Sequence, residues 1–177
     1  MRRRNAQIAL AAMLIAPAFA GAAPPELAHL RQQTQAQMRF FGLLIYDIRL
    51  WAATRVDAQS WHLQVLALEL EYARSLRGAE IAKRSLAEMR RQADISASQA
   101  QAWLSEMEAA FPDVKAGDRL SGLHEPGEAI SFFVNGRLQR RIQDPLFSRL
   151  FLGIWLAPQS SEPGLRKQLL GSIDGGR

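Results

Sequence analysis

The sequence predicts an α+β fold in which helices cover one face of a mainly antiparallel sheet. Residues 131–142 have the pattern of a β-hairpin, because Asn135 and Gly136 tolerate the positive φ angles that a two-residue turn requires. Asp144 follows with a side-chain oxygen suited to cap a helix, and Pro145 fits the first helical position. A hairpin that leads straight into an amphipathic helix indicates that the helix packs on the sheet.

The segment after Pro145 has the apolar spacing of a helix that is buried along one side. Its apolar residues recur three and four positions apart, at Leu146, Phe147, Leu150, Phe151 and Ile154. The chain has 177 residues, of which 48% are hydrophobic. We therefore expect a single domain with a substantial core.

The first twenty residues have the pattern of a secretory signal peptide. Three arginines precede an apolar run over 8–20, which is shorter than the roughly 20 residues that span a bilayer as a helix. A small-x-small pattern ends at Ala20, where we expect cleavage. The sequence thus predicts a signal peptide at 1–20, one domain at 21–177, and a periplasmic protein of a Gram-negative bacterium without stable membrane insertion.

Charge and residue content restrict the classes of function. Three of the 22 basic residues lie in 1–20, which leaves 19 against 17 acidic residues, a net charge of +2. We therefore expect no nucleic-acid partner, which would require a concentrated basic face. The chain has no cysteine, so its stability must come from the core. His29, His62 and His124 stand in three different segments, and we expect neither a metal site nor a cofactor.

Two segments near the start of the domain leave alternatives open. The polar segment 26–37 is either a helical lead-in or a first edge strand. From 38 to 52 the sequence turns to β-branched and aromatic residues, with Gly42 inside the run. A glycine there marks a bulge or a bend, so this run is one long bent strand or two strands in tandem.

The rest of the chain alternates between strand and helix patterns. We expect a strand over 61–72, helices over 78–91 and 96–111, a strand over 119–124, and a last helix capped by Ser161. In the first of these strands, Glu69 and Glu71 share one face, which we interpret as solvated. In the helix over 78–91, Arg84 and Glu88 are expected to face water.

Three stretches of the chain resemble the bacterial exported chalcone isomerase-like proteins, a branch of the chalcone isomerase superfamily. The stretches are MRFFGLLIYDIRLW, AWLSEMEAAFPDVKAGDRLSGLHEPG and FFVNGRLQRRIQDPLFSRLFLGIWLAPQSSEPGLRKQLLG. Together they run from Met38 to Gly171. The resemblance implies an open-faced β-sandwich, in which a large antiparallel sheet is covered on one face by helices.

Five residues are candidates for a ligand site: Arg39, Tyr46, Asp47, Arg49 and Trp155. Asp47 and Arg49 alternate with Tyr46 on one strand, so they can line a cleft or form a salt-bridged outer face above a core tyrosine. By the resemblance, Tyr46 stands at the position where the plant enzymes have their catalytic threonine, and Arg39 is the nearest candidate for their arginine. Arg39 lies either beneath the helices or in solvent, and Trp155 can form the wall of a pocket.

Three functions are compatible with the resemblance. The first is non-catalytic binding of a small apolar or amphipathic carboxylate, such as a fatty acid, with Arg39 and Tyr46 as its partners. The second is isomerase or lyase chemistry on a chalcone-like phenolic enone, which would make the protein an enzyme. The third is a ligand-free module for interaction with other proteins.

Overall fold

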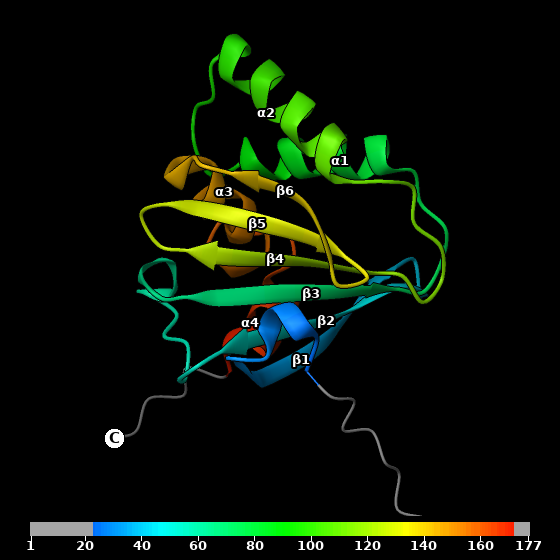
Figure 1. Ribbon diagram of the computed structural model, residues 1–177, viewed down its shortest axis with the longest axis vertical. Coiled ribbons are helices and arrows are strands. Elements are labelled where there is room, and N and C mark those ends of the chain that lie inside the picture. Colours follow the sequence, from blue (N-terminus) through cyan, green and yellow to red (C-terminus); the bar gives the residue numbers. More distant parts are fainter. Residues whose placement is uncertain (1–22, 172–177) are drawn as a thin grey trace, which may run out of the picture.

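The computed structural model describes residues 23–171, which form one six-stranded antiparallel sheet with the strand order β1-β2-β3-β4-β5-β6. Four α-helices pack with this sheet, and α3 and α4 lie behind it in Figure 1. The elements are η1 (Pro25–Leu27), β1 (Arg31–Phe40), β2 (Leu43–Ala52), η2 (Trp61–Leu63), β3 (Leu66–Tyr72), α1 (Gly78–Met89), α2 (Ala97–Ala110), β4 (Arg119–Glu125), β5 (Ala129–Val134), β6 (Arg137–Ile142), α3 (Pro145–Leu156) and α4 (Pro163–Leu170). The predicted α+β class is confirmed. The signal-peptide prediction falls on 1–20, outside the described residues.

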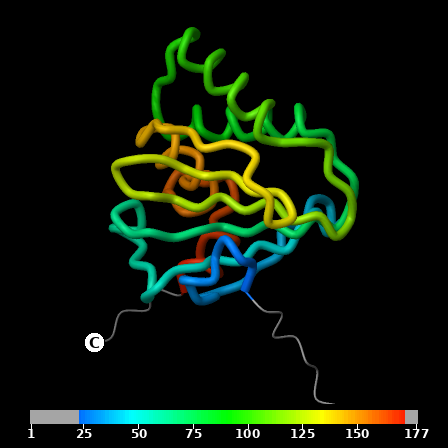
Figure 2. Tube along the Cα trace, viewed as in Figure 1, coloured from blue at the N-terminus to red at the C-terminus, as the bar shows by residue number. Residues whose placement is uncertain are grey.

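The main core lies between the sheet and the helices, because alternate strand residues point to that side. In β3, Leu66, Leu68, Leu70 and Tyr72 are all buried there, as the alternation predicts. The apolar side of α3 meets them with three buried aromatic residues, Phe147, Phe151 and Trp155. The course of the chain in Figure 2 shows each strand lying beside the next one in sequence.

The predicted hairpin and helix at the centre of the chain are confirmed. Asn135 and Gly136 join β5 to β6 with φ angles of 49° and 79°. The carboxylate of Asp144 caps α3 by accepting the Phe147 N–H at 3.0 Å. Its other oxygen accepts the indole N–H of Trp103 at 2.9 Å, so the same residue also ties α2 to the start of α3.

The run over 38–52 contains a second hairpin in place of the predicted bulge or bend. Phe41 and Gly42 form its turn, with φ angles of 47° and 79°. Positive φ at both central residues is the twist that suits a two-residue hairpin. The segment over 26–37 contributes most of η1 and most of the edge strand β1. Of the two alternatives for this segment, the first edge strand is therefore the better description.

Two other boundaries differ from the predictions. The strand expected from Trp61 begins at Leu66, because Trp61–Leu63 forms a short 3-10 helix. The last helix begins at Pro163, and no side chain caps its first turn. Among the described residues, no helix has the length and apolar character needed to cross a membrane.

His124 is a buried polar residue on the helix side of β4. Its Nδ1 lies 2.6 Å from the hydroxyl of Ser148, and its Nε2 lies 3.0 Å from the carbonyl oxygen of His62. A carbonyl oxygen only accepts, so Nε2 carries the proton and Nδ1 accepts from the hydroxyl. The neutral ring therefore satisfies both neighbours.

We expect His124 to make stability depend on pH. Burial lowers the pKa of His124 in the folded chain, so the unfolded chain binds that proton more readily. The free energy of unfolding should fall as pH drops below about 6.5, by at most about 1.4 kcal/mol per pH unit. Urea denaturation between about pH 7.5 and pH 5.5 should show a smaller fall for His124→Gln than for His29→Gln, since His29 is exposed. Equal falls in the two variants would contradict this role.

Candidate functional site

A cavity of about 380 Å³ opens between the sheet and the helices at the end of the molecule where β2, β3, α1 and α3 meet. This volume lies within the range of small-molecule sites. Most of its lining is apolar, and the residues are Met38, Phe40, Ile45, Tyr46, Leu70, Tyr72, Leu76, Glu80, Ile81, Arg84, Ser85, Glu88, Phe111, Leu120, Phe151, Ile154, Trp155, Ser161 and Glu162. An apolar chamber with a few polar groups is typical of a site for an apolar or amphipathic molecule.

Tyr46 and Trp155 form the polar contact inside this chamber. The indole N–H of Trp155 donates to the Tyr46 hydroxyl oxygen at 3.0 Å. The ring of Tyr46 lies edge-on to that of Tyr72, with centroids 5.9 Å apart, because the two residues are paired across β2 and β3. Among the described residues, no acceptor is seen for the proton of the Tyr46 hydroxyl, so this O–H is available to a ligand.

Burial controls the ionisation of both tyrosines. Desolvation raises the pKa of Tyr46 to about 12, against the lowering effect of the hydrogen bond from Trp155. The pKa of Tyr72 is also raised by burial. Both phenols therefore stay protonated over the physiological range and act as hydrogen-bond donors rather than as bases.

The charged groups of the cavity come mainly from α1. Arg84 and Glu88 are four residues apart, so they share one side of the helix, and their ion pair measures 2.6 Å. The side chain of Arg84 is 70% exposed, whereas that of Glu88 is 8% exposed and also lies 3.5 Å from Arg91. Glu80, on the same helix, pairs with Lys83 at 3.2 Å. The guanidinium of Arg84 thus lies at the edge of the chamber. Only one of its nitrogens pairs with Glu88, so its other N–H groups are left to bind a ligand.

The structure brings together two of the five predicted site residues. Tyr46 and Trp155 line the cavity and are hydrogen-bonded to each other. Arg39 does not line it: the residue is exposed on β1, where its guanidinium donates to the Gly42 carbonyl at 3.1 Å and to Gln37 at 2.9 Å. The alternative that places Arg39 beneath the helices is therefore wrong, because its side chain folds along the edge strand.

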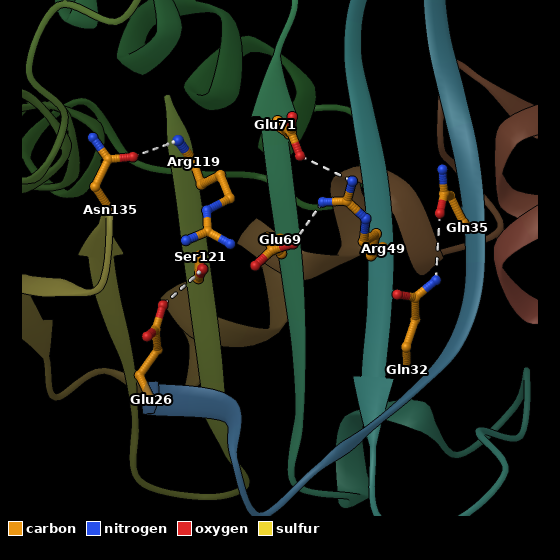
Figure 3. Close-up of polar contacts among 9 residues, drawn as sticks. All are labelled: Glu26, Gln32, Gln35, Arg49, Glu69, Glu71, Arg119, Ser121 and Asn135. Carbon is orange, nitrogen blue, oxygen red and sulfur yellow. Dashed lines mark hydrogen bonds and ion pairs between the residues drawn. The ribbon is translucent and has the colours of Figure 1, made fainter. Parts of the chain in front are cut away.

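Asp47 and Arg49 lie on the opposite face of the sheet from the cavity. Figure 3 shows Arg49 on β2 reaching across to β3, where it donates to Glu69 at 2.7 Å and to Glu71 at 2.9 Å. Asp47 accepts from Gln37 at 2.9 Å on the same face. The interpretation as a salt-bridged outer face holds for Arg49, whereas Asp47 forms only a hydrogen bond there, and neither residue lines the cavity.

This outer face is less solvated than the sequence predicts. Glu69 is only 1% exposed, although we expected it in water. The segment before β1 folds over this face, where Leu27 and Leu30 pack with Trp51. Glu26 from the same segment accepts the Ser121 hydroxyl at 3.2 Å, as Figure 3 shows.

Sequence reasoning missed Arg84 and Glu88 as cavity residues, because both were assigned to the solvent side of their helix. Their four-residue spacing in a helix was visible, together with Ile81 and Ser85 on adjoining positions. What the sequence did not show is that α1 turns this side toward the cavity. In residues 23–171 no group of three or more His, Asp or Glu side chains is placed to hold a metal ion.

Comparison with known proteins agrees with this architecture. Residues 38–171 match the model of the chalcone isomerase-like family. A protein of Haemophilus influenzae, described as uncharacterized, is 30% identical over 153 residues, which cover 86% of this chain and 73% of that protein. The crystal structure of a fatty-acid binding protein of Arabidopsis thaliana superposes with a TM-score of 0.61 at 11% identity, covering 82% of this chain and 93% of that one. The structural likeness establishes the fold, and the match over most of the sequence shows that this chain belongs to the chalcone isomerase-like family.

Proposed function

We propose that this protein binds a small amphipathic carboxylate, such as a fatty acid, in the cavity and does not transform it. The observation that carries the proposal is an apolar chamber whose lining includes two donors with hydrogen-bonding capacity to spare, the Tyr46 hydroxyl and the Arg84 guanidinium. The glutamates of the lining, Glu80, Glu88 and Glu162, oppose an anion, so Arg84 must outweigh them. A carboxylate accepts from both groups, and a hydrogen bond to a charged donor is the stronger kind. The name of the plant protein with the same fold is in line with this ligand class.

The ionisation of the site favours binding over catalysis. Isomerisation of a phenolic enone requires a group that removes or stabilises a proton near neutral pH. The raised pKa of Tyr46, about 12, keeps that phenol protonated, and no histidine is among the residues that line the cavity. Tyr46 therefore serves the site as a hydrogen-bond donor rather than as a base.

The binding proposal predicts that Arg84 distinguishes an acid from an alcohol of the same chain length. By calorimetric titration with dodecanoate and dodecanol, Arg84→Ala should weaken dodecanoate binding about tenfold or more and leave dodecanol binding nearly unchanged. Lys83→Ala is the matched control, because it removes a neighbouring cation of the same helix that does not line the cavity. Tighter binding of dodecanol than of dodecanoate by the unmodified protein would contradict a carboxylate ligand, since Glu80, Glu88 and Glu162 would then decide the preference.

We also propose that the protein is exported to the periplasm and that its leader is removed after Ala20. The support is the arginine-led apolar run over 8–20 and its small-x-small ending. N-terminal sequencing of the protein from a periplasmic fraction should begin at Gly21. Recovery of the intact chain from the cytoplasm would contradict export.

A further inference from the structure

The turn of the β1–β2 hairpin exposes three large apolar side chains next to one another. Phe40 is 58% exposed, Phe41 is 90% exposed and Leu43 is 53% exposed. The two phenylalanine rings lie edge to face with centroids 4.6 Å apart, so they form one apolar patch. We call Phe40–Leu43 the hairpin tip. A contiguous exposed apolar patch of this kind marks an interaction surface.

Turn chemistry does not account for the residue at the centre of the tip. Phe41 has a φ of 47°, which is unfavourable for a bulky L-residue and easily adopted by asparagine. The equivalent position of the β5–β6 turn is Asn135, with a φ of 49°. The same chain thus builds a similar turn with the residue that local geometry favours. An exposed phenylalanine at position 41 adds backbone strain and gains little burial. Its side chain therefore does not serve the stability of the fold, which points to contact with another molecule.

The tip adjoins the cavity. Phe40 lines the chamber together with Met38 before it and Ile45 after it. The apolar surface is therefore continuous from the exposed tip to the inside of the site. A partner that covers the tip also covers this side of the cavity.

The charges around the tip are positive. Arg39 donates to the carbonyl of Gly42 within the turn at 3.1 Å, and Arg74 donates to the carbonyl of Leu44 at 3.2 Å. Residues 38–46 contain no acidic residue. None of the ion pairs within residues 23–171 includes Arg39 or Arg74, so both cations remain available to an anionic partner.

We propose that the hairpin tip inserts into the surface of an anionic lipid bilayer, with Arg39 and Arg74 against lipid phosphates. Exposed aromatic and leucine side chains flanked by arginines match the boundary between headgroups and acyl chains. Docking in this orientation brings the apolar path along Phe40 to the membrane. If the cavity takes an apolar ligand, as proposed above, the tip places the cavity at the source of that ligand.

Insertion is tested with a tryptophan at the tip. The four native tryptophans are all buried, so Phe41→Trp adds the one exposed indole within residues 23–171. With vesicles of phosphatidylethanolamine and phosphatidylglycerol that carry brominated acyl chains, its emission should shift to shorter wavelength and be quenched. Leu138→Trp is the control, because Leu138 is similarly exposed, at 58%, but lies on β6 at the other edge of the sheet. Quenching of both indoles to the same extent, or of neither, would overturn the proposal.

A second variant measures the strength of docking. Phe41→Asn suits the positive φ and should fold normally, yet it should bind the same vesicles about tenfold less tightly. Arg39→Ala should weaken binding about fivefold at low salt. Both variants should keep the affinity for dodecanoate in solution, so a failure of docking is distinguishable from a failure of ligand binding. A blue shift of Phe41→Trp that depends on protein concentration without vesicles would instead assign the tip to self-association and overturn the proposal.

Discussion

Replacement of Arg49 by alanine is expected to lower the free energy of unfolding by about 3 kcal/mol. Arg49 is the ion-pair partner of Glu69, whose side chain is only 2% exposed, and it also binds Glu71. Burial opposes the charge of Arg49, but its hydrogen bonds to the two glutamates outweigh that effect and raise the pKa of the guanidinium. Removal of the guanidinium would leave a buried carboxylate without its partner. Loss of one partner lowers the free energy of unfolding more than replacement of both partners does.

Two comparisons separate this effect from the general loss of an arginine. Arg141→Ala removes the exposed ion pairs to Glu125 and Glu128 and should change stability by less than about 1 kcal/mol. The double replacement Arg49→Met and Glu69→Leu should recover most of the loss, because no buried charge remains. Urea denaturation followed by circular dichroism measures all three. A loss from Arg49→Ala no larger than that from Arg141→Ala would contradict the role of the buried pair.

Gly78→Ala is expected to destabilise the protein by about 3 kcal/mol and to weaken ligand binding. A methyl group at Gly78 would overlap the carbonyl oxygen of Phe111 and lie 2.8 Å from the carbonyl carbon of Pro112. Both neighbours are backbone atoms, so the start of α1 must move. Since α1 carries Arg84 and Glu88, its displacement changes the cavity as well as the packing.

Gly164→Ala is the matched control for this prediction. Gly164 lies in the first turn of α4, and an added methyl group there meets no atom within 4 Å. This variant should be as stable as the unmodified protein or slightly more so, because alanine restricts the unfolded chain. Thermal unfolding and dodecanoate titration of both variants give the comparison. Equal stability of Gly78→Ala and Gly164→Ala would contradict the close approach at α1.

The sequence was sufficient for elements whose signals are local. Asn135 and Gly136 fix a turn by their own conformational preferences, and Asp144 caps α3 through a neighbour three residues away. The alternation that puts Tyr46 and Asp47 on opposite faces of β2 likewise depends only on the two-residue period of a strand. These parts of the fold and one wall of the cavity were predictable for that reason.

The remaining features depend on contacts between distant segments. The turn at Phe41 and Gly42 carries only the glycine as a signal, because phenylalanine does not favour positive φ. Glu69 is buried because the segment before β1 folds over its strand. Arg84 and Glu88 belong to the cavity because of how α1 is oriented against the sheet and α3. A periodic pattern shows which residues share a face, but not what that face meets.

Native mass spectrometry of the protein recovered from cells that express the full chain tests the central claim of ligand binding most directly. Ser85→Phe is the comparison, because Ser85 lines the cavity and its hydroxyl bonds only to the Ile81 carbonyl of its own helix. We expect the unmodified protein to carry a small apolar acid. Ser85→Phe, whose added ring fills the cavity, should carry none and should keep a similar melting temperature. A bare mass for the unmodified protein, or the same bound molecule in both, would contradict a ligand site in this cavity.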